Sequence, residues 1–136
     1  MRAEWNNKGL HATLYVLDDD DEDELLIGIL APAGQGEHDR DRAIAPYVAG
    51  GRAALYIPYL DVPRARRGRG LGAAAVRLAL QVTAKRGADR VYLYANAQRG
   101  HVRDLARFYE RLGFQPLGPR DLAQGGVPMG WYARTR

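Results

Sequence analysis

The residues whose types and spacing could do chemistry lie in a basic, glycine-rich turn. Between residues 64 and 72 the turn carries four arginines and three glycines: Arg64, Arg66, Arg67, Gly68, Arg69, Gly70 and Gly72. The first amides of a helix have no internal partner and lie at the positive end of its dipole, so a turn ahead of a helix suits an anion. Glycine lets an anion approach the backbone, and arginine adds a forked donor. The pattern therefore predicts phosphate binding.

The segments on either side of the turn are those that such a site requires. The apolar run from Arg52 to Val62 predicts a strand, and Leu71 to Arg86 predicts a helix because apolar residues recur at helical spacing. The turn alone is a weak signal. It fits neither the dinucleotide fingerprint nor the Gly-Lys-Ser/Thr ending of a P-loop.

Length and composition exclude several classes of protein. The chain has 136 residues, which suits one domain spanning 1–136. It has no cysteine, so disulfides, thiolate metal sites and a cysteine nucleophile are excluded, and its three histidines lack ligand spacing, so we expect no metal. We expect a cytoplasmic protein without membrane contact, because no apolar run is long enough to span a bilayer and no signal-peptide core is present.

The basic residues are mostly arginine. Two of the 20 basic residues are lysines, so 20 − 2 = 18 are arginines, and the formal net charge is +4. Arginine suits bidentate phosphate recognition. A codon bias is the alternative explanation, and non-specific nucleic-acid binding is a further one.

The first half of the chain predicts strands joined by polar loops. Residues 1–9 are expected to be a frayed lead-in, and residues 10–17 and 25–30 are expected to form an antiparallel hairpin around an acidic run, residues 18–24. Residues 33–51 predict a long loop with a helical turn near residues 41–48. Pro58 in the next strand predicts a bulge or an unpaired N–H.

The second half alternates helices and strands. After the helix at 71–86, we expect a strand at 91–95, a helix at 101–112, and strands at 114–117 and 129–133. A strand, a helix and a strand of this length imply a parallel pair. The expected fold class is α/β (α+β), with helices packed on one mixed sheet.

A second segment, Phe108-Tyr-Glu-Arg-Leu-Gly-Phe114, closes the second helix. Together with Arg67-x-x-Gly70-x-Gly72, and with one helix and one strand between them, it resembles the GNAT N-acetyltransferase family. The resemblance covers roughly the C-terminal two-thirds of the chain. It implies a mixed, twisted sheet that splays between the strands ending at Val62 and Asn96.

The resemblance also implies acetyl-CoA as co-substrate and an amine on a small molecule, peptide or protein as acceptor. The glycine turn would hold the pyrophosphate, and the pantetheine arm would pair with exposed backbone in the splay. The implied cofactor-binding residues are Leu60, Asp61, Val62, Arg67, Gly68, Arg69, Gly70, Leu71, Gly72, Asn96, Arg103 and Tyr109.

The implied reaction is direct transfer of acetyl to the amine, without a covalent enzyme intermediate. A backbone N–H near Val62 would stabilise the tetrahedral intermediate, and Tyr109 would donate a proton to the departing thiolate. Each role has an ordinary alternative. Tyr109 lies on an apolar helix stripe and could be a core residue, and Arg67 and Arg69 could be solvated charges. Asn96 could cap a turn, and His101 fits a helix start better than a base.

The sequence leaves open which residue acts as the general base. Many relatives carry a glutamate on the strand before the turn, whereas here Asp61 is the only carboxylate of residues 52–62. Tyr56 and Tyr59 are alternatives that could align a water molecule. Asp61 could equally be a turn residue.

Three departures from the family pattern affect the expected site. Arg103 stands where an asparagine is usual and could reach phosphate instead, and the proline after Val62 comes one place early. Relatives also usually have two helices between their first two strands, and here these helices are expected to be reduced or absent. The acceptor site is then open, completed by a second subunit in a homodimer, or shaped by the loop at 33–51. A binding module for CoA or nucleic acid, without catalysis, is the alternative function, although nucleic acid is the weaker reading because the arginines are spread along the chain.

Overall fold

The computed structural model describes residues 1–19, 23–48, 50–63, 67–96, 102–118 and 125–133. Its seven strands form one sheet in the order β1-β2-β3-β4-β5-β7-β6. The strands are β1 (Arg2–Lys8), β2 (His11–Leu17), β3 (Glu24–Pro32), β4 (Ala53–Leu60), β5 (Arg90–Ala95), β6 (Gln115–Pro116) and β7 (Val127–Tyr132). The helices are α1 (Leu71–Lys85), α2 (Val102–Arg111) and two short 3-10 helices, η1 (Glu37–Asp39) and η2 (Ala45–Tyr47).

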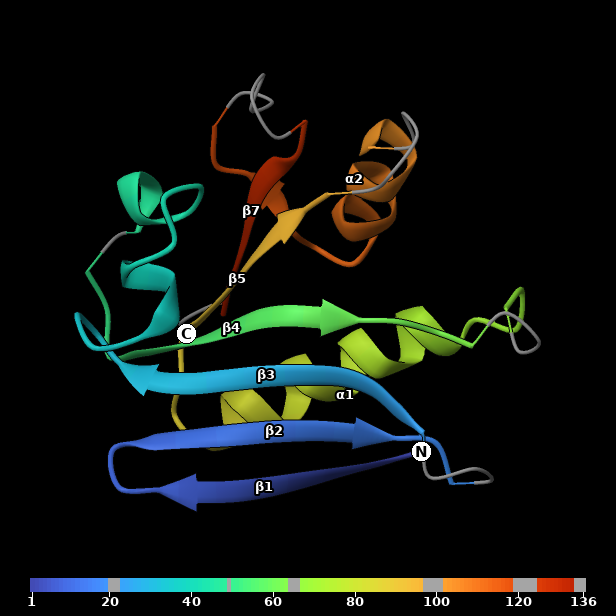
Figure 1. Ribbon diagram of the computed structural model, residues 1–136, viewed down its shortest axis with the longest axis horizontal. Coiled ribbons are helices and arrows are strands. Elements are labelled where there is room, and N and C mark those ends of the chain that lie inside the picture. The colour runs from blue at the N-terminus through green and yellow to red at the C-terminus, as the bar shows by residue number, and fades with distance from the viewer. Residues whose placement is uncertain (20–22, 49, 64–66, 97–101, 119–124, 134–136) are drawn as a thin grey trace.

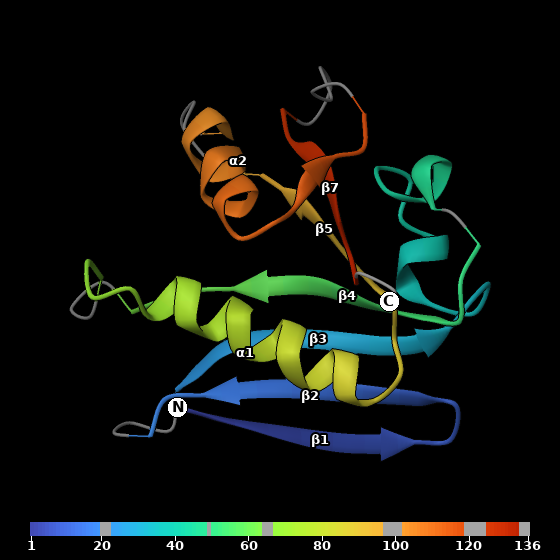
Figure 2. The ribbon, with the colours of Figure 1, turned by 180° about the vertical axis from the view of Figure 1, so that it is seen from behind.

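The sheet is strongly twisted, and its two α-helices cover different parts of it. β1 to β4 run nearly side by side, while β5 and β7 turn away from them and carry α2 beside them (Figure 1). α1 crosses β1, β2 and β3 on one face (Figure 2). The opposite face of these three strands carries no helix among the described residues.

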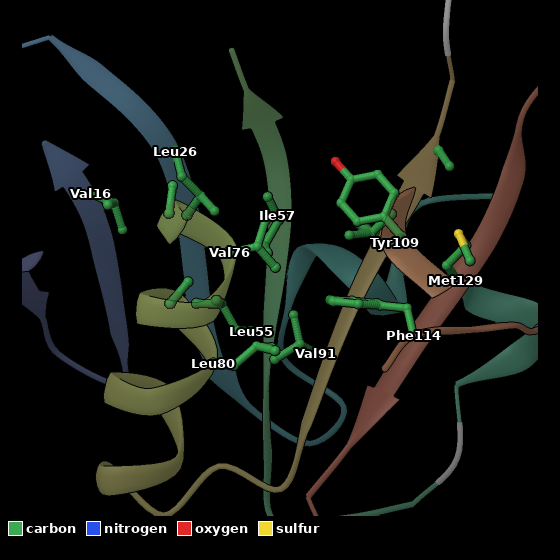
Figure 3. Packing of buried hydrophobic residues seen from close by; sticks show 14 of the residues in the cluster. Val16, Leu26, Leu55, Ile57, Val76, Leu80, Val91, Tyr109, Phe114 and Met129 are labelled. Atoms are coloured by element: carbon green, nitrogen blue, oxygen red, sulfur yellow. The ribbon is translucent and has the colours of Figure 1, made fainter. Parts of the chain in front are cut away.

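The expected helices form because their apolar residues lie on one side. α1 buries Ala75, Val76, Ala79, Leu80 and Thr83. These side chains meet Val16, Leu26 and Leu55 of the sheet in the main core, which continues to Tyr109 and Phe114 near α2 (Figure 3). The predictions of helices at 71–86 and 101–112 are therefore confirmed within one residue at each end.

The expectation for residues 1–9 was wrong, because residues 2–8 form the edge strand β1. β1 pairs antiparallel with β2 along its whole length, and the turn at Gly9 and Leu10 joins them. Most side chains of this strand are polar, so its sequence lacks the alternation of apolar and polar residues that indicates a strand. Ala3 and Trp5 pack against the main core, and the Arg86 guanidinium just after α1 lies 4.3 Å from the Trp5 ring centre.

The acidic run joins β2 to β3, as expected, and these two strands pair antiparallel. The expected loss of the N-terminal helices is confirmed at a different place. They are missing between β1 and β2, where two residues make the connection. The two C-terminal strands also differ from expectation: β6 is only two residues long and β7 begins at Val127.

The segment between β3 and β4 packs against the sheet instead of extending into solvent. Ile44 is fully buried against Ala54 and Tyr92. The Tyr56 hydroxyl donates a hydrogen bond to the Asp41 carboxylate at 2.6 Å. The expected helical turn is present as η2, and η1 is an additional turn in which His38 stacks on Tyr92.

β4 contains the irregularity that Pro58 predicts. Tyr56 pairs with Ile29 and Tyr59 with Ile27, so Ile57 and Pro58 both lie opposite Gly28 in a β-bulge. β4 and β5 are parallel, but their pairing runs only from Ala54–Arg90 to Ile57–Leu93. Beyond these residues the two strands diverge (Figure 1). The predicted splay of the sheet is therefore present.

None of the helices within the described ranges combines the length and the apolar character that crossing a bilayer requires.

Replacing Gly28 with alanine should destabilise the fold. A Cβ atom at Gly28 would lie 2.8 Å from Leu55 Cδ1 and 3.0 Å from Leu55 Cγ. Overpacking of this kind lowers the free energy of unfolding by about 1–3 kcal/mol, which urea denaturation measures. Gly50→Ala is the control, because no atom lies within 4 Å of its Cβ position. Equal stability of the two variants would contradict the packing described for β3 and β4.

Candidate active site

A cavity lies where β4 and β5 part, and we call it the transfer cavity. Its volume is about 160 Å³. The strands supply most of its lining and α2 supplies the rest: Ile57, Pro58, Tyr59, Leu60, Leu93, Tyr94, Asn96, Leu105 and Tyr109. Because strand residues alternate between the faces of a sheet, this lining includes residues from both faces, and the cavity lies in the gap of the sheet itself.

The backbone of Leu60 faces this gap. The Asp61 amide donates to the Leu25 carbonyl oxygen on β3 at 2.9 Å. Because neighbouring residues of a strand direct their backbone groups to opposite sides, the N–H and C=O of Leu60 point away from β3. β5 no longer pairs with β4 at this level. Leu60 therefore offers backbone hydrogen-bonding groups to a ligand in the gap, whereas the Asp61 amide is already engaged.

A second cavity, which we call the cradle cavity, adjoins the transfer cavity at Leu60 and Leu105. It has a volume of about 270 Å³. It is lined by Leu60, Asp61, Val62, Arg67, Gly72, Leu105 and Phe108. It therefore lies between the end of β4 and the start of α1, with α2 on its other side.

The start of α1 is open to this cavity. Gly70 precedes the helix with a φ of 73°, a left-handed conformation that favours glycine, and no side chain caps the helix. A Cβ atom at Gly72 would point between Phe108 and Val62, 3.6 Å from each. A larger side chain would fill the cradle, whereas glycine leaves the first amides of α1 accessible. This geometry fits a pyrophosphate.

Arginine supplies positive charge beside these amides. Arg67 Nε donates to the Val62 carbonyl oxygen at 3.0 Å, and Arg67 Nη2 lies 3.6 Å from Asp61 Oδ1. Gly68, Arg69 and Gly70 are exposed, and Leu71 begins α1 half-buried. These residues of the predicted cofactor site thus lie together, while Arg64 and Arg66 are outside the described residues.

Tyr109 of α2 is almost fully buried, with 6% of its surface exposed. Its ring packs edge-to-face on Phe108 and Phe114, with ring centres 5.1 and 5.6 Å away. Figure 3 shows the hydroxyl pointing toward β4, on the side of Ile57. Burial raises the pKa of Tyr109 to about 12, so the phenol keeps its proton at neutral pH. Tyr109 is therefore a core residue that also lines the transfer cavity, and its role as proton donor stays a prediction.

The candidates for the base lie in different places. Asp61 is half-exposed beside Arg67 and does not line the transfer cavity. The Tyr56 hydroxyl is bonded to Asp41, and burial together with that bond raises the pKa of Tyr56. Tyr59 lines the transfer cavity and is 41% exposed. Of these three residues, only Tyr59 touches the transfer cavity.

Asn96 and Arg103 are the remaining residues of the predicted cofactor site. Asn96 is exposed at the end of β5 and lines the transfer cavity. Arg103 lies in the first turn of α2, and its side chain is outside the described residues, as is the whole of His101.

Sequence reasoning missed part of the lining. Tyr94 and Leu93 come from β5, and Leu105 comes from α2. Their apolar character indicated only burial. They lie near the end of β4 because the pairing of β4 with β5 stops at Ile57 and Leu93. The residue types alone do not specify where this pairing stops.

Comparisons with known proteins agree with this geometry. The family described as "Acetyltransferase (GNAT) family" matches residues 2–114. Mycothiol acetyltransferase from Beutenbergia cavernae is 42% identical over 74 residues, which are 54% of this chain and 23% of that protein. The chain therefore spans less than a quarter of that relative's length.

Solved structures with the same fold cover most of the chain. Arabidopsis thaliana NAA60 in complex with a bisubstrate analogue superposes with a TM-score of 0.60 at 17% identity, over 94% of this chain and 79% of that one. An acyl-CoA N-acyltransferase from Pseudomonas aeruginosa gives a TM-score of 0.57 at 22% identity, over 91% and 69%. At these identities the two structures show the fold alone.

The raised pKa of Tyr109 predicts a loss of stability in alkali. In the unfolded chain a tyrosine ionises near pH 10, but folded Tyr109 holds its proton to about pH 12. The stabilising effect is complete below pH 10 and is lost as the pH rises from 10 to 12, because only the unfolded state has released the proton. Tyr109→Phe should remove about 1 kcal/mol of the decline in unfolding free energy between pH 10 and 11, as measured by urea denaturation. An identical decline in both proteins would contradict the buried phenol.

Proposed function

Because the chain belongs to the acetyltransferase (GNAT) family, we propose that its active site moves an acetyl group from acetyl-CoA to a primary amine. The observation that supports this most is the transfer cavity, in which unpaired strand backbone and the Tyr109 hydroxyl meet in a gap of the sheet. A non-catalytic CoA-binding or nucleic-acid-binding module has no comparable support.

Three groups of the chain would hold the co-substrate. The amides at the start of α1 and the Arg67 guanidinium face the cradle cavity, where a pyrophosphate would bind. The backbone of Leu60 would pair with the amides of the pantetheine arm. Asn96 follows the end of the opposite strand, β5, and lines the same cavity. When bound, acetyl-CoA supplies a thioester with an electrophilic acyl carbon and a thiolate leaving group.

Tyr109 would act as the proton donor. Its hydroxyl reaches the transfer cavity with its proton in place, as the raised pKa requires. As the amine nitrogen bonds to the acyl carbon and the carbon–sulfur bond breaks, the phenol would give its proton to the sulfur. The resulting phenolate would recover a proton from solvent.

The amine must lose a proton, and the geometry limits which residue takes it. Asp61 does not line the transfer cavity, so it would act only through water. Tyr59 lies between Asp61 and the transfer cavity and would align that water. We therefore propose Asp61 as the final acceptor and Tyr59 as the positioning residue.

Arg67→Ala should weaken acetyl-CoA binding by about tenfold, the factor expected for losing one charge-assisted contact at an exposed site. Isothermal titration measures the dissociation constant directly. Arg77→Ala is the matched control, because it removes an exposed arginine from α1 away from the cradle cavity. The cradle assignment fails if the two variants bind acetyl-CoA equally well.

Tyr109→Phe should lower kcat by about a hundredfold, the lower range for general acid catalysis. Acetyl-CoA affinity should change less than twofold, because phenylalanine keeps the packing on Phe108 and Phe114. Steady-state rates and titration with acetyl-CoA separate the two effects. Tyr15→Phe serves as the control, since it removes a phenol from β2. Unchanged turnover in Tyr109→Phe would exclude the acid role.

A further inference from the structure

His38 is a buried histidine in the β3–β4 segment, the name used here for residues 33–48. Only 1% of its surface is exposed. Its ring stacks on Tyr92 of β5 with the ring centres 5.4 Å apart. A Cβ atom at Gly36 would clash with Cε1 and Nδ1 of the ring, so the backbone of the segment lies directly against the imidazole. The ring is therefore enclosed between the β3–β4 segment and the sheet.

The two ring nitrogens of His38 differ in their partners. Nε2 lies 3.3 Å from Asp39 Oδ2, an oxygen that also accepts a hydrogen bond from the Gly36 amide at 2.9 Å. Nδ1 is buried and has no hydrogen-bond partner among the described residues. In the neutral ring that donates from Nε2, Nδ1 carries only a lone pair. Protonation would place an N–H there, and a buried donor without an acceptor costs free energy.

The charges around His38 disfavour a second proton on balance. Burial lowers the pKa of His38 most, the Arg90 guanidinium lowers it further, and the Asp39 carboxylate raises it in part. Arg90 is held in place, because its Nε donates to Asp89 Oδ1 at 3.1 Å and its Nη1 donates to the Tyr92 hydroxyl at 3.4 Å. The guanidinium therefore stays beside the tyrosine on which His38 stacks.

The remaining titratable groups near His38 keep their charge in mild acid. Tyr56 of β4 and Tyr132 of β7 lie in the same small core as Tyr92, and burial raises the pKa of both phenols. Glu37 precedes His38 in η1 and is exposed. Carboxylates and phenols ordinarily titrate outside the range from about pH 5 to 7, whereas histidine titrates within it. His38 is therefore the group whose charge changes in this range.

The β3–β4 segment connects His38 to the transfer cavity. Ile44 of this segment is fully buried against Tyr92, and Tyr94 packs against the same small core. Tyr94 also lines the transfer cavity, and its hydroxyl accepts a hydrogen bond from the Gly126 amide at 2.9 Å. Detachment of the segment would uncover Tyr94 and remove the packing on one side of the transfer cavity.

We propose that His38 is a pH-sensitive switch: the neutral ring holds the β3–β4 segment on β5, and protonation in mild acid releases the segment and loosens the Tyr94 side of the transfer cavity. His38 is then a positioning residue that acts through Tyr92 and Tyr94. The inference concerns the fold, and it does not depend on the proposed acetyl transfer.

The direction of the pH effect follows from the two states of the segment. In the released state His38 ionises near the ordinary histidine pKa of about 6.5, whereas burial lowers the pKa of the attached ring. The attachment has its full strength above about pH 6.5 and weakens as the pH falls, because the released state then binds the proton more tightly. It is weakest below the pKa of the attached ring, where both states are protonated.

Amide hydrogen exchange of the ligand-free protein tests the switch, with rates corrected for the intrinsic effect of pH. The Ile44 and Tyr47 amides donate within the segment, to the carbonyl oxygens of Asp41 and Ile44, and such short turns do not persist once they are detached. Their protection should fall at least about threefold from about pH 7.5 to about pH 5, and that of Gly126 should fall with it. Val16 of β2 should keep its protection.

Two variants locate the effect. His38→Phe removes the titrating group and keeps an aromatic ring for Tyr92, so protection of the segment should be equal at the two pH values. His11→Gln is the matched control, because His11 Nε2 donates to the Gln35 carbonyl oxygen of the same segment at 2.8 Å. It should behave as the unmodified protein does. A proton NMR titration of the His38 Cε1–H signal needs no substitution and should give a pKa below the ordinary value of about 6.5.

The outcomes decide for or against the switch. Unchanged protection at Ile44 and Tyr47, an equal loss in His38→Phe, or an NMR titration of His38 at or above its ordinary pKa would overturn it. Release at Ile44 with steady protection at Gly126 would overturn the link to the transfer cavity. A loss that is present in His11→Gln and absent in His38→Phe would support the switch. Because no substrate is used, failure of acetyl transfer would leave these results unaffected.

Discussion

The structure depends on one interruption of strand pairing. β4 and β5 are hydrogen-bonded partners up to Ile57 and Leu93, and then they separate. The separation begins at the bulge where Ile57 and Pro58 share one partner on β3, and proline has no N–H to offer a neighbouring strand. Backbone N–H and C=O groups of a sheet are normally hydrogen-bonded. The unpaired stretch of β4 beyond Ile57 therefore has backbone groups that a ligand could bind. The transfer cavity and the cradle cavity adjoin this stretch.

The short N-terminal half lacks the helices that relatives usually carry, while the opening between β4 and β5 is present. β1 and β2 are joined by a two-residue turn, so no helix covers the adjoining face among the described residues. The segment between β3 and β4 covers part of that side through Ile44, and the Tyr56–Asp41 hydrogen bond ties it to β4. Asp23 and Glu24, at the start of β3, line a cavity together with Tyr59 and Asp61.

Individual residue types made many of the helices and strands, and the residues around the cradle cavity, predictable from the sequence. Gly70 and Gly72 mark a helix start because only small residues keep its amides accessible, and Pro58 marks an irregular strand. Tyr109 was predicted as a site residue because the segment around it is distinctive, although the apolar helix stripe alone indicated a core residue. The structure buries it in the core and places it in the lining of the transfer cavity. β1 was missed because an edge strand needs little apolar patterning. The joining of Tyr59 to Asp23 and Glu24 depends on the register between β3 and β4, which no local pattern specifies.

The central claim is that the parted strands receive acetyl-CoA, and amide hydrogen exchange with and without this ligand tests it most directly. The account predicts slower exchange at Leu60, at the first amides of α1 from Leu71 onward, and at Asn96. Exchange at Asp61 should change little, because its amide is already bonded to Leu25. Protection confined to other parts of the chain, or no protection at saturating acetyl-CoA, would contradict the account.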